Sequence, residues 1–228
     1  MIVIPQFPNG RFGNRVLYYN NMRQLAAKHN LGYRSPPWEG DSVFDIPNQI
    51  ADNTNWEILQ HCLGEKFFSD HYISTREIFK LKNKIELPGE CLAIHFRGTD
   101  FHEWNPEAIP APDYYINAIE EYGKVDTYYL FTDDRDLPSY LNVVKYLPEE
   151  KIKYGSPNSV FNDFITMCYC DGIISSPSTF AICAGFIGKH KKIIHSEKWI
   201  NSRVAVDDKF WVDLKNGGNE DYSLWRLV

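Results

Sequence analysis

The strongest chemical signal in this 228-residue chain is the segment His95-Phe96-Arg97-Gly98-Thr99-Asp100, which follows an apolar run. Arg97 carries a planar fork of N–H donors that suits a phosphate, and Gly98 lets the backbone turn close to a ligand. Asp100 could orient Arg97 or contact a sugar hydroxyl. The segment is typical of an anion site, and the alternative is a local ion pair between Arg97 and Asp100 with His95 in the core.

Two more polar segments follow apolar runs. Ser175-Ser176-Pro177-Ser178-Thr179-Phe180 leads into a predicted helix, where hydroxyl groups and backbone N–H groups can bind phosphate. Ser and Thr are also the common N-caps of any helix. Phe131-Thr132-Asp133-Asp134 could accept hydrogen bonds from a ribose or a base, or could cap a helix and supply its acidic first turn.

A fourth segment, Gly10-Arg11-Phe12-Gly13-Asn14-Arg15, stands between the first predicted strand and helix, but it lacks the G-x-G-x-x-G fingerprint and its acidic partner. We expect Arg11, Asn14 and Arg15 to face the sheet that follows residue 90. The chain has no H-E-x-x-H motif, P-loop or G-x-S-x-G elbow, and no metal-ligand spacing. These observations favour a site that binds a pyrophosphate group without a metal ion.

A parallel sheet would bring the ends of these apolar runs together. Strand-like runs alternate with helix-like segments after Pro88-Gly89, which indicates βαβ units with ligands at the carboxyl ends of the strands. The runs are Cys91 to Phe96, Tyr128 to Phe131, Lys151 to Tyr154, Gly172 to Ser175 and Lys192 to His195, and the helices fall near 112–122, 135–146, 160–170 and 179–188. An opening strand, Ile2 to Ile4, and a helix near 13–30 indicate another α/β domain. We therefore expect domains at 1–89 and 90–228, without a predicted order for residues 38–89.

Composition excludes several classes of protein. The chain is 43% hydrophobic and has a net charge of −6, so it should fold and should not attract nucleic acid or an anionic membrane as a whole. We expect its cysteines to be reduced thiols, because they are odd in number and form no C-x-x-C pair; they are Cys62, Cys91, Cys168, Cys170 and Cys183. The short apolar start does not resemble a signal peptide, and 172–188 is better explained by a loop and a buried helix than by a membrane span. We expect a cytoplasmic protein, and the sequence gives no indication of oligomeric state.

Taken in order, these segments resemble the GDP-fucose-dependent fucosyltransferases, in particular the α-1,2-fucosyltransferases and, at the N-terminus, the protein O-fucosyltransferases. Residues 95–100 are similar to the family's H-x-R-x-x-D donor motif, and residues 10–14 to its N-terminal glycine-asparagine signature. The other matching segments are Pro36-Pro37-Trp38, Asp113 to Ile119, Leu130 to Asp134, Asp163 to Met167, Ser176 to Phe180 and Lys198-Trp199. The resemblance covers most of residues 90–200 and about the first 40.

The resemblance implies a GT-B-like α/β fold of two Rossmann-like domains, with a reduced acceptor-side domain at 1–89 and the donor-nucleotide domain at 90–228. It implies transfer of fucose from GDP-fucose to a glycan hydroxyl, with inversion and without a metal or cofactor. Arg97 would neutralise the departing β-phosphate, with Asp100 as the second catalytic residue. The implied donor-binding residues are His95, Arg97, Asp133, Ser178, Thr179, Phe180, Gly13 and Asn14, and the acceptor-side candidates are Arg11, His102 and Glu103.

Two departures from the family pattern keep alternatives open. Gly98 stands where many relatives carry a second arginine, and Ala181-Ile182-Cys183-Ala184 replaces the tryptophans that usually follow the serine-phenylalanine segment. The chain is also short for a two-domain transferase. The alternatives are the same fold with another nucleotide-sugar donor, or a non-catalytic module that binds a nucleotide sugar or glycan. The general base stays open among Asp100, His102 and Glu103.

Overall fold

The computed structural model describes residues 2–7, 10–47, 49–50, 57–58, 73–156, 158–196, 198 and 225–228. Within these residues the chain divides into two compact units, with the boundary between Lys84 and Ile85, close to the boundary expected from the sequence. Unit 1 is the N-terminal part of the described chain and unit 2 the C-terminal part. Cys62 and Trp199, the second residue of the Lys198-Trp199 segment, lie outside the described residues.

Unit 1 is a small α/β unit built around one long helix. Its strands are β1 (Ile2–Val3), β2 (Tyr33–Arg34), β3 (Gln49–Ile50) and β4 (Glu57–Ile58), and its helices are α1 (Phe12–Lys28), α2 (Gly40–Val43) and α3 (Thr75–Ile78). The strands form a sheet in the order β3-β2-β1-β4, in which only β3 is antiparallel to its neighbour. Helix α1 packs against β1 and β2 and against α2 and α3. The expected strand-then-helix opening of the chain is therefore present.

An aromatic cluster fills the core of unit 1. The Trp38 ring lies 5.5 Å from the Tyr19 ring and 6.0 Å from the Phe12 ring, and Phe44 packs 4.9 Å from Phe79. All five side chains are buried. Aromatic side chains bury a large apolar area each, so a few of them can stabilise a unit whose strands are only two residues long.

Unit 2 contains a six-stranded parallel sheet. Its strands are β5 (Cys91–Phe96), β6 (Thr127–Thr132), β7 (Ile152–Tyr154), β8 (Gly172–Ser175), β9 (Lys192–His195) and β10 (Trp225–Leu227). They lie in the order β10-β9-β8-β5-β6-β7. Every residue of β5 is buried, as expected for a central strand with both faces covered. Read from β7 to β10, this is the 3-2-1-4-5-6 order of Rossmann-type sheets.

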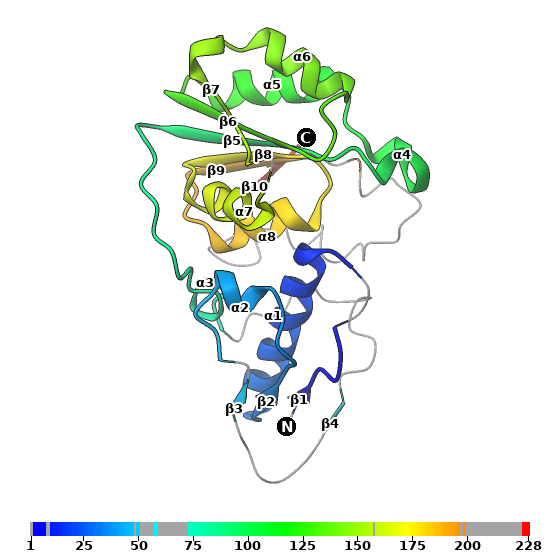
Figure 1. Ribbon diagram of the computed structural model, residues 1–228, viewed down its shortest axis with the longest axis vertical. Coiled ribbons are helices and arrows are strands. Elements are labelled where there is room, and N and C mark those ends of the chain that lie inside the picture. Colours follow the sequence, from blue (N-terminus) through cyan, green and yellow to red (C-terminus); the bar gives the residue numbers. More distant parts are fainter. Residues whose placement is uncertain are drawn as a thin grey trace. The chain divides into compact units, whose positions relative to one another are not determined.

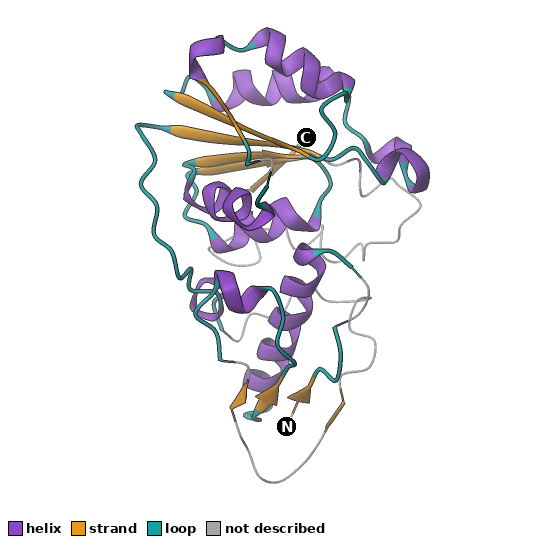
Figure 2. Cartoon of the chain, viewed as in Figure 1, coloured by secondary structure: helices purple, strands orange, loops and turns teal. Residues whose placement is uncertain are grey.

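Helices cover both faces of this sheet, as Figure 1 shows for α5 and α6 on one face and α7 and α8 on the other. The elements are α4 (Phe101–Trp104), η1 (Pro106–Ala108), α5 (Pro112–Tyr122), α6 (Pro138–Tyr146), η2 (Glu149–Lys151), α7 (Val160–Tyr169) and α8 (Thr179–Ile187). Figure 2 shows the resulting layers of helix, strand and helix. Helix α5 begins with Pro112 and stops at Gly123, whose φ of 104° suits glycine.

Alternate residues of β5 point to opposite faces. Leu92, Ile94 and Phe96 join the core beneath α5 and α6, together with Tyr115 and Val143. His95 points to the face that α7 and α8 cover, where its ring lies 5.8 Å from that of Phe180 in α8. The α/β fold with a parallel sheet is confirmed, while the GT-B arrangement stays a prediction. No helix in the described part of the chain is long and apolar enough to cross a membrane.

Candidate functional site

The chain changes direction across the sheet between β5 and β8. From β5 it moves outward through β6 and β7, and it then returns to the other side of β5 to form β8, β9 and β10. The loops that leave β5 and β8 therefore diverge at the carboxyl edge, where open α/β sheets bind their ligands. The loop after β8 begins beside β5, because the Ser176 N–H donates to the carbonyl of His95 in that strand at 3.1 Å.

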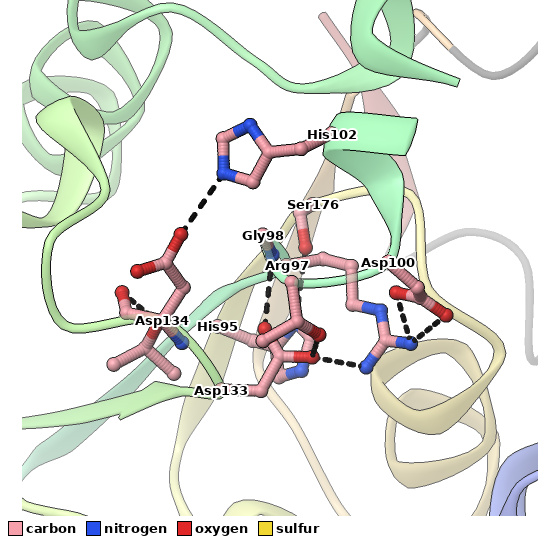
Figure 3. Close-up of polar contacts among 10 residues, drawn as sticks. His95, Arg97, Gly98, Asp100, His102, Asp133, Asp134 and Ser176 are labelled. Atoms are coloured by element: carbon pink, nitrogen blue, oxygen red, sulfur yellow. Dashed lines mark hydrogen bonds and ion pairs between the residues drawn. The ribbon is translucent and has the colours of Figure 1, made fainter. Parts of the chain in front are cut away.

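Arg97 is the first residue after β5, and its guanidinium lies between two carboxylates (Figure 3). Nη1 donates to Asp133, and Nη2 donates to Asp100 at 2.6 Å. The register of the sheet explains the first contact, because Phe96 pairs with Thr132 and the next residues are Arg97 and Asp133. The ion pair between Arg97 and Asp100 that the sequence left as an alternative is present.

Asp133 receives hydrogen bonds from three consecutive residues of the β5–α4 loop. Besides Arg97, the Gly98 N–H donates to Oδ1 at 2.9 Å, and the Thr99 hydroxyl donates to Oδ2 at 2.7 Å. Burial raises the pKa of the Asp133 carboxyl, but these donors outweigh it, so its pKa lies below the usual value. The alternative that Asp133 and Asp134 cap the next helix is wrong, because α6 begins at Pro138 with Leu137 as its N-cap.

The space around residue 98 explains why a glycine stands there, which the sequence alone did not reveal. A Cβ on residue 98 would lie 2.6 Å from the Asp134 Cβ and 2.8 Å from its Oδ2. The carboxylate of Asp134 in turn lies 2.9 Å from Nε2 of His102 in α4. In Figure 3, His102 points to Asp134 while Arg97 points to Asp133 and Asp100. This backbone therefore has Asp134 in the space that a second arginine at position 98 would need.

A buried polar layer lies beneath the edge. His95 is 7% exposed, and its Nδ1 lies 3.0 Å from the Ser176 hydroxyl, while His195 at the end of β9 is fully buried against the Ser175 hydroxyl. Burial lowers the pKa of His95 to about 4 and that of His195 to about 3. Both rings are therefore neutral at pH 7, and the layer carries no net charge.

The loop after β8 leads directly into α8. Ser178 is the N-cap residue, but its side chain makes no capping hydrogen bond to the helix, so the ordinary role of an N-cap serine is not filled here. Thr179 and Phe180 begin the helix, and the Phe180 ring packs edge-on against Phe164 at 5.3 Å. The first turn of α8, whose N–H groups have no partner within the helix, thus follows directly after the loop that begins beside His95.

Asp163 is a further acidic residue on this side of the sheet. It lies in the first turn of α7, where its Oδ1 accepts the Ser156 N–H at 2.6 Å. Burial raises its pKa to about 6, although that hydrogen bond opposes the shift. A Cβ on Gly155 would come within 3.1 Å of both carboxylate oxygens and 2.9 Å of Phe131, so the site is closely packed. The sequence placed Asp163 in a matching segment but gave it no role.

Unit 2 thus contains, at or just after the ends of β5, β6 and β8, most of the predicted donor-binding residues, which are His95, Arg97, Asp133, Ser178, Thr179 and Phe180. The predicted catalytic residue Asp100 and the acceptor-side candidate His102 lie in the same unit, directly before and within α4. Glu103 is exposed on α4. Arg11, Gly13 and Asn14 lie in unit 1 at the start of α1, and their role toward the donor stays a prediction. Thr99, Asp134 and Ser176 were missed as partners, because only the strand register brings them into contact.

In the described part of the chain, no group of three or more His, Cys, Asp or Glu side chains is arranged to hold a metal ion. Four described cysteines, Cys91, Cys168, Cys170 and Cys183, are buried free thiols. Comparison with protein-family models, with curated proteins and with solved structures finds no match for this chain.

Proposed function

We propose that the protein is an inverting, metal-independent glycosyltransferase that moves fucose from GDP-fucose to a hydroxyl of a glycan or glycoconjugate. The donor would bind at the carboxyl edge of unit 2, with no cofactor. A cytoplasmic place in glycan synthesis belongs to the same proposal. The observation that carries it is the divergence of the β5 and β8 loops at the switch point of a Rossmann-ordered sheet.

The chemistry of these loops supports a diphosphate leaving group. When the bond between sugar and phosphate breaks, negative charge develops on the diphosphate, and a cation or a set of N–H donors must stabilise it. Arg97 at the end of β5 supplies the guanidinium, and Asp100 orients it at 2.6 Å. The N-terminus of α8, with Ser178 and Thr179, supplies further donors for an anion.

The nucleotide and the sugar rest on the sequence resemblance. Within that proposal, Asp133 and Phe180 line the nucleotide site, and His95 contributes from beneath it as a neutral imidazole, because burial lowers its pKa to about 4. A neutral imidazole donates from one nitrogen and accepts at the other, so His95 would act by hydrogen bonding and add no charge. Arg97 is then the principal cation of the leaving-group site.

Calorimetric titration with GDP and with GDP-fucose tests the proposal, with UDP as a control nucleotide and EDTA present throughout. We expect metal-independent binding of GDP to the wild type and a loss of at least about tenfold in Arg97→Ala, which removes a charge-assisted contact. Arg135→Ala is the matched control, because Arg135 is an exposed arginine on the loop after β6. Absence of nucleotide binding, or an equal loss in both variants, would contradict the proposal.

The second candidate is a non-catalytic module that binds a nucleotide sugar or a glycan. It is favoured by the pairing of Arg97 with two carboxylates and by the absence of a second arginine at Gly98. Release of GDP from GDP-fucose, measured with and without glycan acceptors, separates the two candidates. Nucleotide binding without any turnover favours the non-catalytic module. If GDP-mannose or another nucleotide sugar binds more tightly than GDP-fucose, that nucleotide sugar replaces GDP-fucose as the proposed donor.

A further inference from the structure

The donors that converge on Asp133 are those that hold phosphate groups in proteins. A guanidinium, a backbone N–H and a hydroxyl come from three consecutive residues, Arg97, Gly98 and Thr99. The same donor types contact phosphate oxygens in protein complexes. The β5–α4 loop therefore has the composition of an anion site, and its occupant is a carboxylate of the same chain.

We propose that Asp133 occupies this anion site when no ligand is bound, and that a phosphate group of the ligand displaces the Asp133 carboxylate from it. The inference deepens the proposed function and rests on it for the choice of phosphate as the anion. Asp133 is then an internal competitor of the donor, a role opposite to that of a residue that only holds Arg97 in place.

The surroundings allow such an exchange. The Asp133 side chain is 26% exposed and lies on the loop between β6 and α6, so it can turn into water without uncovering the core. Arg97 stays oriented without it, because Asp100 holds Nη2 and the Phe101 ring lies 5.6 Å from the guanidinium carbon. The Phe101 N–H also holds the Gly98 carbonyl at 2.8 Å, which fixes the turn.

An internal competitor weakens ligand binding, because only molecules in which the site is empty can bind. The apparent Kd is the intrinsic Kd divided by the fraction of such molecules. Charge-assisted hydrogen bonds of the kind that hold Asp133 are among the stronger ones in proteins. Neutralising the carboxylate weakens this competition. We therefore expect pyrophosphate to bind Asp133→Asn at least about tenfold more tightly than it binds the wild type.

Calorimetric titration with inorganic pyrophosphate is the test, on the wild type, Asp133→Asn and Asp134→Asn. Asp134→Asn is the matched control, because it removes the same charge at the next position but its carboxylate contacts His102. A gain confined to Asp133→Asn, and abolished when Arg97→Ala is added, supports the displacement. Weaker binding in Asp133→Asn, or an equal gain in both variants, would overturn it; circular dichroism verifies that each variant is folded.

The readout separates this inference from the proposed function. Pyrophosphate carries neither guanosine nor fucose, so its binding does not depend on the identity of the donor. If GDP binds the wild type but neither ligand binds more tightly to Asp133→Asn, the displacement is wrong and the proposed function stands. If pyrophosphate binds Asp133→Asn more tightly but GDP and GDP-fucose do not bind, the anion site stands and the donor is wrong.

Discussion

Lowering the pH from 7 to 5 is expected to reduce the free energy of unfolding of unit 2, because two histidines are buried as neutral rings. The pKa is about 4 for His95 and about 3 for His195, both below the ordinary value of 6.5. The unfolded chain therefore takes up protons first as the pH falls. The stability that these groups contribute is complete above pH 6.5 and is lost as the pH falls toward the folded-state values.

The size of the effect follows from the two pKa differences. At pH 5 an unfolded histidine is almost fully protonated, while both buried rings are still neutral. This difference lowers the free energy of unfolding by about 2 kcal/mol for each ring and about 4 kcal/mol in total. Asp163 acts in the opposite direction, because its pKa is raised to about 6 and it gains a proton in this range. Allowing for its exposure, it returns less than about 1 kcal/mol. The net loss is about 3 kcal/mol.

Denaturant titrations between pH 5 and 8 measure this loss, with hydrogen exchange at the amides of β8 and β9 as a readout within unit 2. His195→Asn keeps a side-chain nitrogen near the Ser175 hydroxyl and should remove about 2 of the 3 kcal/mol of pH-dependent loss. His29→Asn, at the exposed C-terminal end of α1, is the control substitution outside the core. Equal stability of the wild type at pH 7 and pH 5, or a full pH dependence in His195→Asn, would refute the reasoning.

Three further predictions concern single positions. Gly98→Ala should lower the free energy of unfolding by about 1 to 3 kcal/mol in urea titrations, because the new Cβ would lie 2.6 Å from that of Asp134; unchanged stability would contradict the steric argument. Asp163→Asn should raise stability at pH 7 by about 1 kcal/mol, because it removes a carboxylate whose pKa burial raises to about 6 while an amide oxygen can still accept the Ser156 N–H. That gain should vanish at pH 4, and a gain that persists there would point to another cause. His190→Ala should cost about 2 kcal/mol relative to Lys189→Ala, because the His190 ring nitrogens lie 2.8 Å and 3.1 Å from two buried backbone carbonyls, and equal thermal unfolding of the two variants would contradict this.

The regular part of unit 2 could be predicted from the sequence because its signals are local. The apolar run Cys91 to Phe96 is as long as a typical strand, and Pro112 and Gly123 mark the two ends of α5. The N-terminal end of α6 was predicted too early, because Pro138 sets the first turn of that helix. Local chemistry thus determines where most elements begin and end.

Contacts that depend on pairing between distant residues could not be predicted. Strand β10 has only three residues and acquires its place by pairing with β9, and the strands of unit 1 are too short to show a period. The three donors to Asp133 depend on the register between β5 and β6. The sequence could therefore name the residues of the candidate site, while the partner of each donor depends on the fold.

Unit 2 places its first strand at the centre of its sheet, and this order bears on how the nascent chain folds. Leu92 of β5 pairs with Gly172 of β8, and the Cys91 N–H bonds to Asp171, 80 positions along the chain. Until β8 is synthesised, one edge of the apolar strand β5 has no partner and can pair with another chain. Closure over so many residues is slow. We therefore expect chaperone dependence during translation, with aggregation of chains released before β8.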